Sequence, residues 1–398
     1  MPAERDLIDA SAFADICAPA SARDCIDLIL RTGFSPSAYR DCFGDLAEQG
    51  FNPTQALAHF FRHGLQEGRS VTMDLDLGAF LALARLPIGN QWLRANLLST
   101  LARQLFDPKN TKSGAYIAER WPQVLVLREI GARPYFIAGD SHAALFVHTT
   151  AREDTWLLPI HISCSAGSAR GLVNPKSVSG YGTMLRDIVS AIQDLPNIDQ
   201  VPFLMQFGQV DLEFVYNYTR VREDRPRLDL GDYRRFCDDT AQRYAGFLTN
   251  LRGRQRMSLI SVFPPVLSDK ALRGGYVTDD IVWRESDLSS HDLSMRLRKF
   301  EMADIAQRTA IHAHFNARLR AAADSLGIGF VDAMTPFLGA DGIVHPDYII
   351  PETEGAEHHM NGRYTRPTAQ SIVWERMDAA ARIVPPTVAA MQAAWQRL

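Results

Sequence analysis

The chain has 398 residues, with 42 Lys and Arg side chains against 46 Asp and Glu, so its formal net charge is -4. Hydrophobic residues make up 46% and charged residues 22%, an ordinary globular composition that excludes a disordered, collagen-like or coiled-coil chain. The near-neutral balance argues against a nucleic-acid-binding protein, because a surface that binds phosphates would be strongly basic. The length predicts two domains, or one large domain with an appendage.

No segment reaches the roughly 18 consecutive apolar residues of a membrane-spanning helix. The first residues include Glu4, Asp6 and Asp9, where a signal peptide would have a basic flank and an apolar run. The sequence therefore predicts a cytoplasmic protein without a membrane span. Five cysteines without a C-x-x-C pair predict reduced, mostly buried thiols rather than disulfides or a zinc site.

Residues 1–95 predict a helical module, and residues 96–132 predict a helical connector. Apolar side chains recur at three- and four-residue spacing, as amphipathic helices require, over 25–30, 46–48, 54–64 and 75–85. Asn52-Pro53-Thr54 is a helix-start signal, because Pro presets φ and small polar side chains accept from free N–H groups.

From residue 133 to residue 398, strands alternate with helices. Short apolar runs predict strands over 135–138, 145–148, 156–162, 203–207, 259–263 and 328–331, and the longest helices are expected over 181–195, 233–251 and 302–326. This alternation predicts an α/β domain with a parallel sheet covered by helices on both faces. Two polar runs, 216–230 and 264–299, break the rhythm and are expected to be irregular insertions near a functional site.

Ser141 is the first candidate for chemistry. An apolar strand runs into Gly139-Asp140-Ser141, which places the hydroxyl at the carboxyl end of a strand, where α/β proteins form their sites. A helix start beside it offers free N–H groups to an anionic intermediate. On its own, G-D-S is also an ordinary turn-and-cap sequence.

The run G-D-S-H at 139–142 resembles the first motif of the SGNH (GDSL-type) hydrolase family, and further motifs follow in the family's order. Residues 168–180 resemble the second motif, 207–211 the third, and 357–364 (E-H-H-M-N-G-R-Y) the last. The resemblance spans residues 133–375. It implies a flavodoxin-like three-layer sandwich and a serine-dependent ester hydrolase or acyltransferase without a cofactor.

In this resemblance Ser141 is the nucleophile and His359 the base that takes its proton. The Asp that the family places three residues before the base is replaced by Ala356. Glu357 and Glu354 are the candidates for the acid that orients the imidazole. A Ser–His dyad and a weakened site remain open alternatives.

The resemblance also implies an oxyanion hole, with the backbone N–H groups of Ser141 and Gly171 as donors. The Asn of the third motif is replaced by Val210, which cannot donate. The neighbouring Gln209 would supply an amide only if the loop twists, because successive side chains of a strand point to opposite sides.

Other residues of the motifs are expected to support the structure: Gly139, Asp140, Gly208, Asp211 and Asn361. His142, where the family has an apolar residue, is expected to pack or to contact the substrate, or else to compete as the base. His358 and His359 lack a further spaced ligand, so no metal is predicted.

Residues 34–71 resemble a short helical module of bacterial proteins in cell-surface and glycan biosynthesis. The matching residues are Tyr39, Pro53, His59, Gly64, Glu67, Gly68 and Arg69. This module is expected to bind a protein partner; a plain helical appendage is the alternative.

Two functions follow. The first is a serine esterase or O-acyltransferase that acts on an acylated, in particular acetylated, carbohydrate or surface polysaccharide through an acyl-serine. The second is a catalytically silent SGNH-like protein that binds glycan or scaffolds a polysaccharide-biosynthesis complex, which the missing Asn and the displaced acid favour. Aromatic residues of the insertions could stack on sugar rings: Tyr216, Tyr218, Tyr276 and Trp283.

Overall fold

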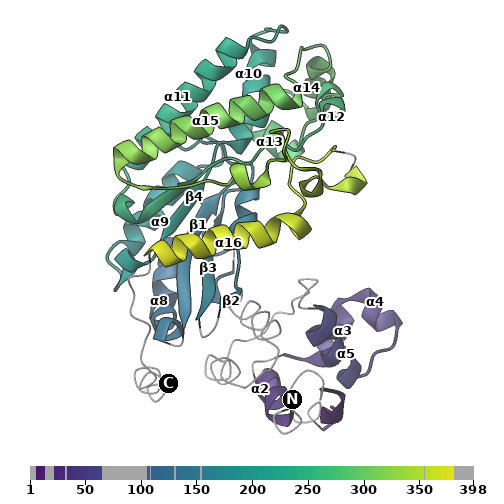
Figure 1. Ribbon diagram of the computed structural model, residues 1–398. Coiled ribbons are helices and arrows are strands. Elements are labelled where there is room, and N and C mark those ends of the chain that lie inside the picture. Colours follow the sequence, from purple (N-terminus) through teal and green to yellow (C-terminus); the bar gives the residue numbers. More distant parts are fainter. Residues whose placement is uncertain are drawn as a thin grey trace.

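A six-stranded sheet lies at the centre of the computed structural model (Figure 1). The described residues are 6–13, 22–31, 34–64, 105–107, 109–129, 131–152, 155–353 and 355–380. The strands are β1 (Ala132–Gly139), β2 (Ala151–Arg152), β3 (Thr155–Ser163), β4 (Phe203–Gln206), β5 (Met257–Ile260) and β6 (Gly329–Val331). Their order across the sheet is β2-β3-β1-β4-β5-β6, with every pair parallel except β2 with β3.

The order of the strands reverses at β1. The next parallel strand along the chain, β3, pairs with one edge of β1, and β4 pairs with the other. Gly139, the last residue of β1, therefore lies between Ser163 and Gln206. In open parallel sheets such a reversal is where ligands bind, outside the carboxyl ends of the strands.

Helices cover both faces of the sheet. Alternate residues of β1 enter different hydrophobic clusters, as the two-residue period of a strand requires. Phe136 and Ala138 pack with α8 (Gly114–Glu129), α9 (Tyr181–Ile192), α11 (Leu230–Thr249) and α15 (Ile305–Leu326). Tyr135 and Ile137 pack with α16 (Gly362–Ala380), which crosses in front of the strands in Figure 1. The prediction of a parallel sheet flanked by helices is confirmed.

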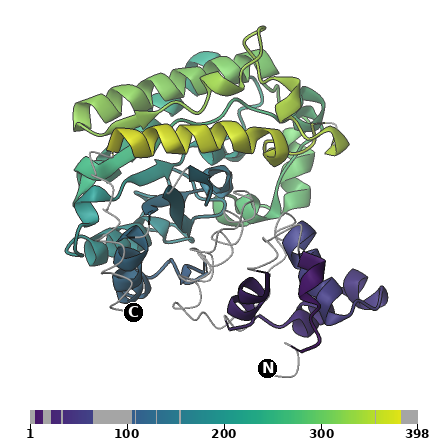
Figure 2. The same cartoon turned by 60° about the horizontal axis from the view of Figure 1, so that its bottom comes forward.

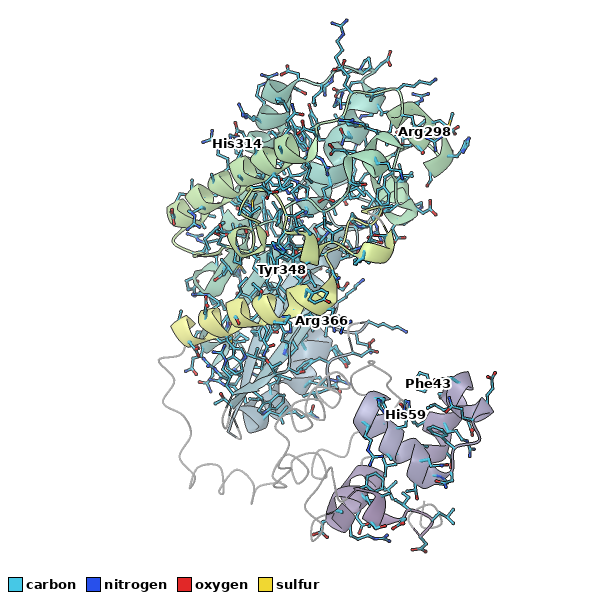
Figure 3. All side chains as sticks on the ribbon, turned by 45° about the vertical axis from the view of Figure 1, so that its right-hand side comes forward. Phe43, His59, Arg298, His314, Tyr348 and Arg366 are labelled. Carbon is cyan, nitrogen blue, oxygen red and sulfur yellow. The ribbon has the colours of Figure 1, made fainter. Side chains whose placement is uncertain are left out.

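Two helices that lie on the same face, α11 and α15, are joined by a polar contact as well as by packing. Asp238 of α11 has its Oδ1 2.8 Å from Nε2 of His314 and 2.7 Å from Nε of Arg318, both on α15 (Figure 3).

The predicted strand over 145–148 is wrong. Residues Ser141–Phe146 form a 3-10 helix, η3, because the side chain of Asp140 caps it by accepting from the N–H of His142. The Tyr135 hydroxyl donates to the carbonyl of Phe146 and accepts from the N–H of His148. The apolar run is thus a buried turn against β1. The other predicted strands are confirmed, except that the one predicted over 259–263 covers Met257–Ile260.

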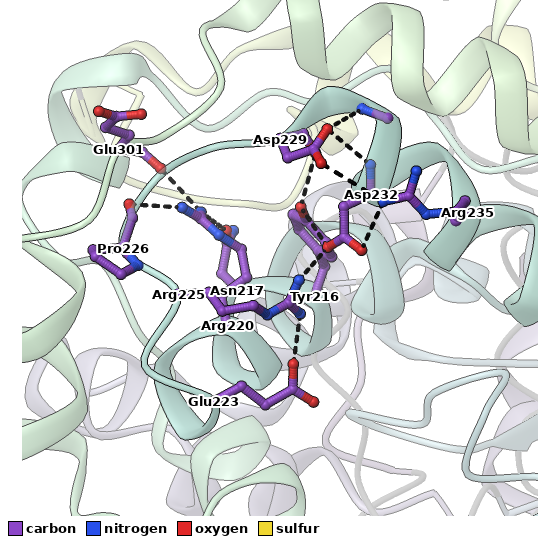
Figure 4. A network of polar contacts seen from close by, with 11 residues as sticks. Tyr216, Asn217, Arg220, Glu223, Arg225, Pro226, Asp229, Asp232, Arg235 and Glu301 are labelled. Carbon is purple, nitrogen blue, oxygen red and sulfur yellow. Dashed lines mark hydrogen bonds and ion pairs between the residues drawn. The ribbon is translucent and has the colours of Figure 1, made fainter.

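The two predicted insertions are helical rather than irregular. They contain α10 (Tyr216–Arg222), α12 (Asp269–Arg273), α13 (Asp279–Glu285) and α14 (Ser290–Leu297). Arg220 of α10 is buried and donates to the side chain of Asn217 and to the carbonyls of Pro226 and Glu301 (Figure 4). The charged residues of 216–230 suggest a loop in the sequence, but in the structure Arg220 holds the backbone of this segment in place.

Shorter helical turns connect these elements: η4 (Ile198–Gln200), η5 (Asp211–Val215), η6 (Arg254–Arg256), η7 (Thr335–Phe337), η8 (Pro346–Tyr348) and η9 (Pro351–Thr353).

The N-terminal residues form short helices, grouped in purple in Figure 2: η1 (Ala10–Phe13), α2 (Ala22–Arg31), α3 (Pro36–Cys42), α4 (Gly44–Glu48), α5 (Pro53–His59) and η2 (Phe60–Gly64). The predicted helix start is confirmed, because Asn52 caps α5 through reciprocal bonds with Gln55. The buried Tyr39 has its hydroxyl 3.1 Å from Nδ1 of His59. The predicted helix over 75–85 and the matching residues Glu67, Gly68 and Arg69 lie outside the described residues.

No helix within the described ranges has the length and apolarity needed to cross a bilayer. Of the cysteines, Cys164 and Cys237 are buried free thiols and Cys42 is an exposed one.

Candidate active site

Ser141 lies where β1 turns into η3. Gly139 makes this turn possible, because a Cβ there would lie 2.4 Å from the carbonyl oxygen of Gln206 and 2.7 Å from Cβ of Ala143. Asp140 then caps η3, and Ser141 is its first residue. The hydroxyl therefore stands at the carboxyl end of the strand at which the sheet order reverses.

The segment that precedes α16 brings His359 to Ser141. Nε2 of His359 lies 2.7 Å from Oγ of Ser141. Two residues later, Asn361 starts α16, since its side chain accepts from the N–H of Arg363. The N–H of Asn361 donates to the carbonyl of Tyr348, which Figure 3 labels close to the beginning of α16. These anchors fix the position of the imidazole.

Glu357 holds the other side of His359. One carboxylate oxygen, Oε1, lies 2.8 Å from Nδ1 of His359 and accepts from its backbone N–H at 3.0 Å. The carboxylate thus reaches the ring from two residues away, where the family pattern places it three residues away. The other candidate acid, Glu354, lies outside the described residues.

The protonation of this pair follows from its surroundings. Burial tends to raise the pKa of Glu357, but the hydrogen bonds from His359 outweigh it and hold that pKa below its ordinary value. Burial lowers the pKa of His359, and the positive charge of His142 lowers it further. A neutral His359 with its proton on Nδ1 donates to Glu357 and leaves Nε2 free to accept from Ser141.

His142 makes a second buried network beside the first. Its Nδ1 lies 3.0 Å from Oδ1 of Asp140, and its Nε2 lies 3.2 Å from the carbonyl oxygen of His358. Both partners only accept, so both ring nitrogens must carry protons and the ring is an imidazolium. Burial lowers the pKa of His142, but Asp140 and Glu213 more than reverse this and raise it to about 9. Because both ring nitrogens of His142 donate, neither can accept the proton of the Ser141 hydroxyl. The hydrogen bonds of His142 therefore do not suit the role of general base.

The third histidine, His358, is bound through its Nδ1, which lies 2.8 Å from the hydroxyl of Tyr276. Burial, together with His142 and His359, lowers the pKa of His358 to about 2. The sequence did not identify Tyr276 as a partner of the last motif, because it lies 82 residues away and no spacing links the two.

The three histidines offer ligand atoms within 4.8 Å of one another, a distance that a metal cluster would also show. However, both ring nitrogens of His142, both of His359 and Nδ1 of His358 already have hydrogen-bond partners. A metal ion would have to displace these partners.

The two further donors predicted for the oxyanion are bound to other groups. The N–H of Gly171 donates to Oγ of Ser168 at 3.0 Å, and that hydroxyl donates to Glu285. The amide of the buried Gln209 donates to Glu213 at 2.6 Å, and its oxygen accepts from a backbone N–H. By contrast, the N–H of Ser141 lies in the first turn of η3, where a helix leaves its N–H groups without an intrahelical acceptor.

Asp211 and Gly208 fix the loops around the site. The buried Asp211 carboxylate accepts from the N–H groups of Ala169 and Arg170 at 2.5 and 3.1 Å, and so ties the second-motif loop to the third motif. Burial raises the pKa of Asp211 to about 7. Gly208 has a φ of +117°, and a Cβ there would lie 2.4 Å from the ring of Phe315. Only glycine fits such a position.

No protein-family model and no curated protein matches the chain. Among solved structures it is similar to a Bacteroides fragilis protein assigned as an acylhydrolase, with 12% identity, a TM-score of 0.32, and coverage of 63% of this chain and 88% of that one. It is also similar to a GDSL-like lipase of Bacteroides thetaiotaomicron, with 14% identity, a TM-score of 0.31, and coverage of 66% and 98%. At this level of similarity, the function has to be inferred from the side chains of this chain.

Proposed function

We propose that the protein is a serine hydrolase or acyltransferase that forms an acyl-enzyme on Ser141. The observation that carries this proposal is the continuous chain of hydrogen bonds from Oγ of Ser141 through His359 to Glu357. A hydroxyl is a weak nucleophile until a base takes its proton, and a second group must orient the base and stabilise its charged form. These hydrogen bonds provide both groups, since His359 is placed to act as the base and Glu357 to orient it.

The reaction follows from this geometry. Oγ of Ser141 attacks the acyl carbonyl while Nε2 of His359 accepts the hydroxyl proton, and Glu357 stabilises the imidazolium that forms. The tetrahedral oxyanion is stabilised by the N–H of Ser141. The intermediate collapses to the acyl-serine, and His359 returns its proton to the departing alkoxide. Water or a second hydroxyl then repeats the sequence in reverse, which makes the protein an esterase or a transferase.

The substrate we propose is an acylated, in particular acetylated, carbohydrate or surface polysaccharide. The likeness of residues 34–71 to modules of glycan biosynthesis supports this substrate class. Of the four aromatic residues considered for sugar stacking, Tyr216 and Tyr218 are buried and Tyr276 is bonded to His358, whereas Trp283 is 64% exposed.

A catalytically silent protein that binds glycan or scaffolds a biosynthetic complex is the second candidate. The observation in its favour is that Gly171 and Gln209, the predicted additional oxyanion donors, are both bound to protein groups. Removing one oxyanion donor from a serine hydrolase typically costs about 3 kcal/mol of transition-state stabilisation.

A fluorophosphonate probe separates these candidates, because the activated hydroxyl displaces fluoride and becomes phosphonylated. We expect one adduct, located at Ser141 by peptide mapping, and turnover of p-nitrophenyl acetate by the same preparation that stops once the adduct has formed. An unlabelled Ser141 with no turnover of any acetyl ester would favour the silent protein.

The Glu357→Gln variant tests the third member of the hydrogen-bond chain. The side-chain amide of the introduced glutamine would donate to Nδ1 of His359 and hold the ring proton on Nε2, facing Ser141, so we expect kcat to fall by up to about 10,000-fold. Glu375→Gln, an exposed position on α16, is the matched control and should keep the wild-type rate. Steady-state kinetics with p-nitrophenyl acetate measures both, and an unchanged kcat in Glu357→Gln would refute the role of this carboxylate.

A further inference from the structure

A cavity of about 400 Å³ lies among the helices of the two insertions, 216–230 and 264–299. It is lined by residues of α10, of α13 and the turn after it, of α14, and of the 174–178 loop: Asn174, Val178, Tyr218, Arg222, Trp283, Arg284, Glu285, Ser286, Asp287, Leu288 and Arg296. Both α10 and α13 contact α14, and Figure 1 shows these helices at the same end of the domain.

The charge of this cavity comes from three guanidinium groups, two of which lie near enough to Glu285 to lower its pKa without forming a close ion pair with it. Among the described residues, the side chains of Arg222, Arg284 and Arg296 make no ion pair and no hydrogen bond. The Nε of Arg284 is moreover buried without any hydrogen-bond partner. A buried donor left unpaired costs about 1–3 kcal/mol.

The two carboxylates of the lining balance the three cations only in part. Glu285 accepts from the hydroxyl of Ser168 at 2.8 Å, and burial raises its pKa. Asp287 is exposed. Three arginines against two acids leave the cavity with a net positive lining, in a chain whose net charge is -4.

An aromatic ring completes the lining. Trp283 is 64% exposed, and the guanidinium of Arg284 lies 5.1 Å from its ring centroid. The exposed indole offers a flat apolar face of the kind that can pack on the C–H face of a pyranose ring. Arginine forks match a carboxylate with two parallel hydrogen bonds.

Two sets of contacts link the wall of the cavity to residues of the candidate active site. The hydroxyl of Ser168 links Glu285, in the cavity wall, to the N–H of Gly171 in the second-motif loop. The ring of Tyr218 contacts Phe214, which contacts the ring of His358. The wall of the cavity and the residues around Ser141 and His359 therefore pack against shared neighbours.

From these observations we infer that the cavity is a subsite for a negatively charged sugar residue, with Trp283 stacking on the ring and Arg284 and Arg296 binding its carboxylate. The inference rests on the proposed function and narrows its substrate class to acidic glycans, those that contain uronic acids. A neutral glycan would leave the arginines unpaired, so it should bind with lower affinity than an acidic one.

Calorimetry with the Ser141→Ala protein tests this inference without turnover. The probes are an O-acetylated oligoglucuronate and a neutral counterpart, whose carboxylates are reduced to primary alcohols before acetylation. We expect the charged probe to bind at least about 10-fold more tightly, as hydrogen bonds between charged groups typically provide. Raising the salt concentration should narrow the difference.

Matched variants in the same Ser141→Ala background assign the effect to the cavity. Arg284→Gln with Arg296→Gln should remove the preference for charge, and Trp283→Ala should weaken both probes. Arg227→Gln, an exposed arginine outside the cavity, should bind like its parent. Equal binding of the two probes, a preference that survives the double variant, or no binding of either probe would overturn the inference.

The failure of the proposed function is visible separately. With p-nitrophenyl acetate, which has no sugar, the cavity variants in the Ser141-containing protein should keep the wild-type kcat/KM. If wild type does not turn over this ester while the charged probe still binds in the cavity, the subsite stands and the acyl-serine mechanism fails.

Discussion

We expect replacement of Ser141 with alanine to lower kcat/KM for p-nitrophenyl acetate by about 1,000-fold or more, because it removes the only hydroxyl within hydrogen-bond distance of His359 among the described residues. Replacing His359 with alanine has a similar effect, since the hydroxyl then keeps its proton. In the proposed mechanism the two side chains act as one unit, so the double variant should be no slower than either single variant.

The measurement is steady-state kinetics of the four proteins, with circular dichroism to show that each is folded. Ser371→Ala, an exposed serine on α16, is the matched control and keeps full activity. If the double variant loses kcat/KM by the product of the two single losses, Ser141 and His359 act in separate steps. Equal kcat/KM in wild type and Ser141→Ala would refute the proposal of an acyl-serine.

The largest effect on stability is expected from His142→Leu, which introduces an apolar residue at this position. The Asp140 carboxylate is completely buried, and His142 is the cation beside it. Removing one member of a buried ion pair leaves the other charge without a partner, which typically costs about 3–5 kcal/mol. Urea denaturation should show this loss, and the double variant Asp140→Asn with His142→Leu should recover most of it.

The dependence of stability on pH gives an independent test in the wild-type protein. The pKa of His142 is raised from 6.5 to about 9 by folding. Its contribution to the free energy of unfolding is therefore complete below pH 6.5 and is lost as the pH rises through 9. His142→Leu should lack this part of the decline between pH 6.5 and 9. Equal slopes in the two proteins would contradict the assignment of an imidazolium.

The sequence predicted those parts of the fold that depend on local patterns. The apolar run before Gly139 predicted β1, and the glycine is required there by the close approach of Gln206. Asn52 and Pro53 predicted the start of α5 because capping is a short-range interaction. The strand predicted over 145–148 was wrong, because a buried 3-10 turn and a buried strand require the same apolar residues.

Long-range hydrogen bonds account for what the sequence could not predict. Nothing in the spacing of the last motif shows that one oxygen of Glu357 reaches both the ring and the backbone of His359. Pairing of Gly171 with Ser168, and of Gln209 with Glu213, depends on loops that meet only in the folded chain. The helices within 216–230 were hidden by charged residues such as Arg220, which is buried among backbone carbonyls.

The proposed acid and base both belong to one tripeptide, Glu357-His358-His359, and the proposed nucleophile lies 218 residues before the base in the chain. The hydrogen bond between Ser141 and His359 thus joins two distant stretches, and the second leads directly into α16, which docks on the sheet. All six strands of the described sheet precede this tripeptide, so the sheet can be complete while Ser141 is still inert. Activity would then appear in one step, when the C-terminal helix closes over the finished sheet and delivers base and acid together.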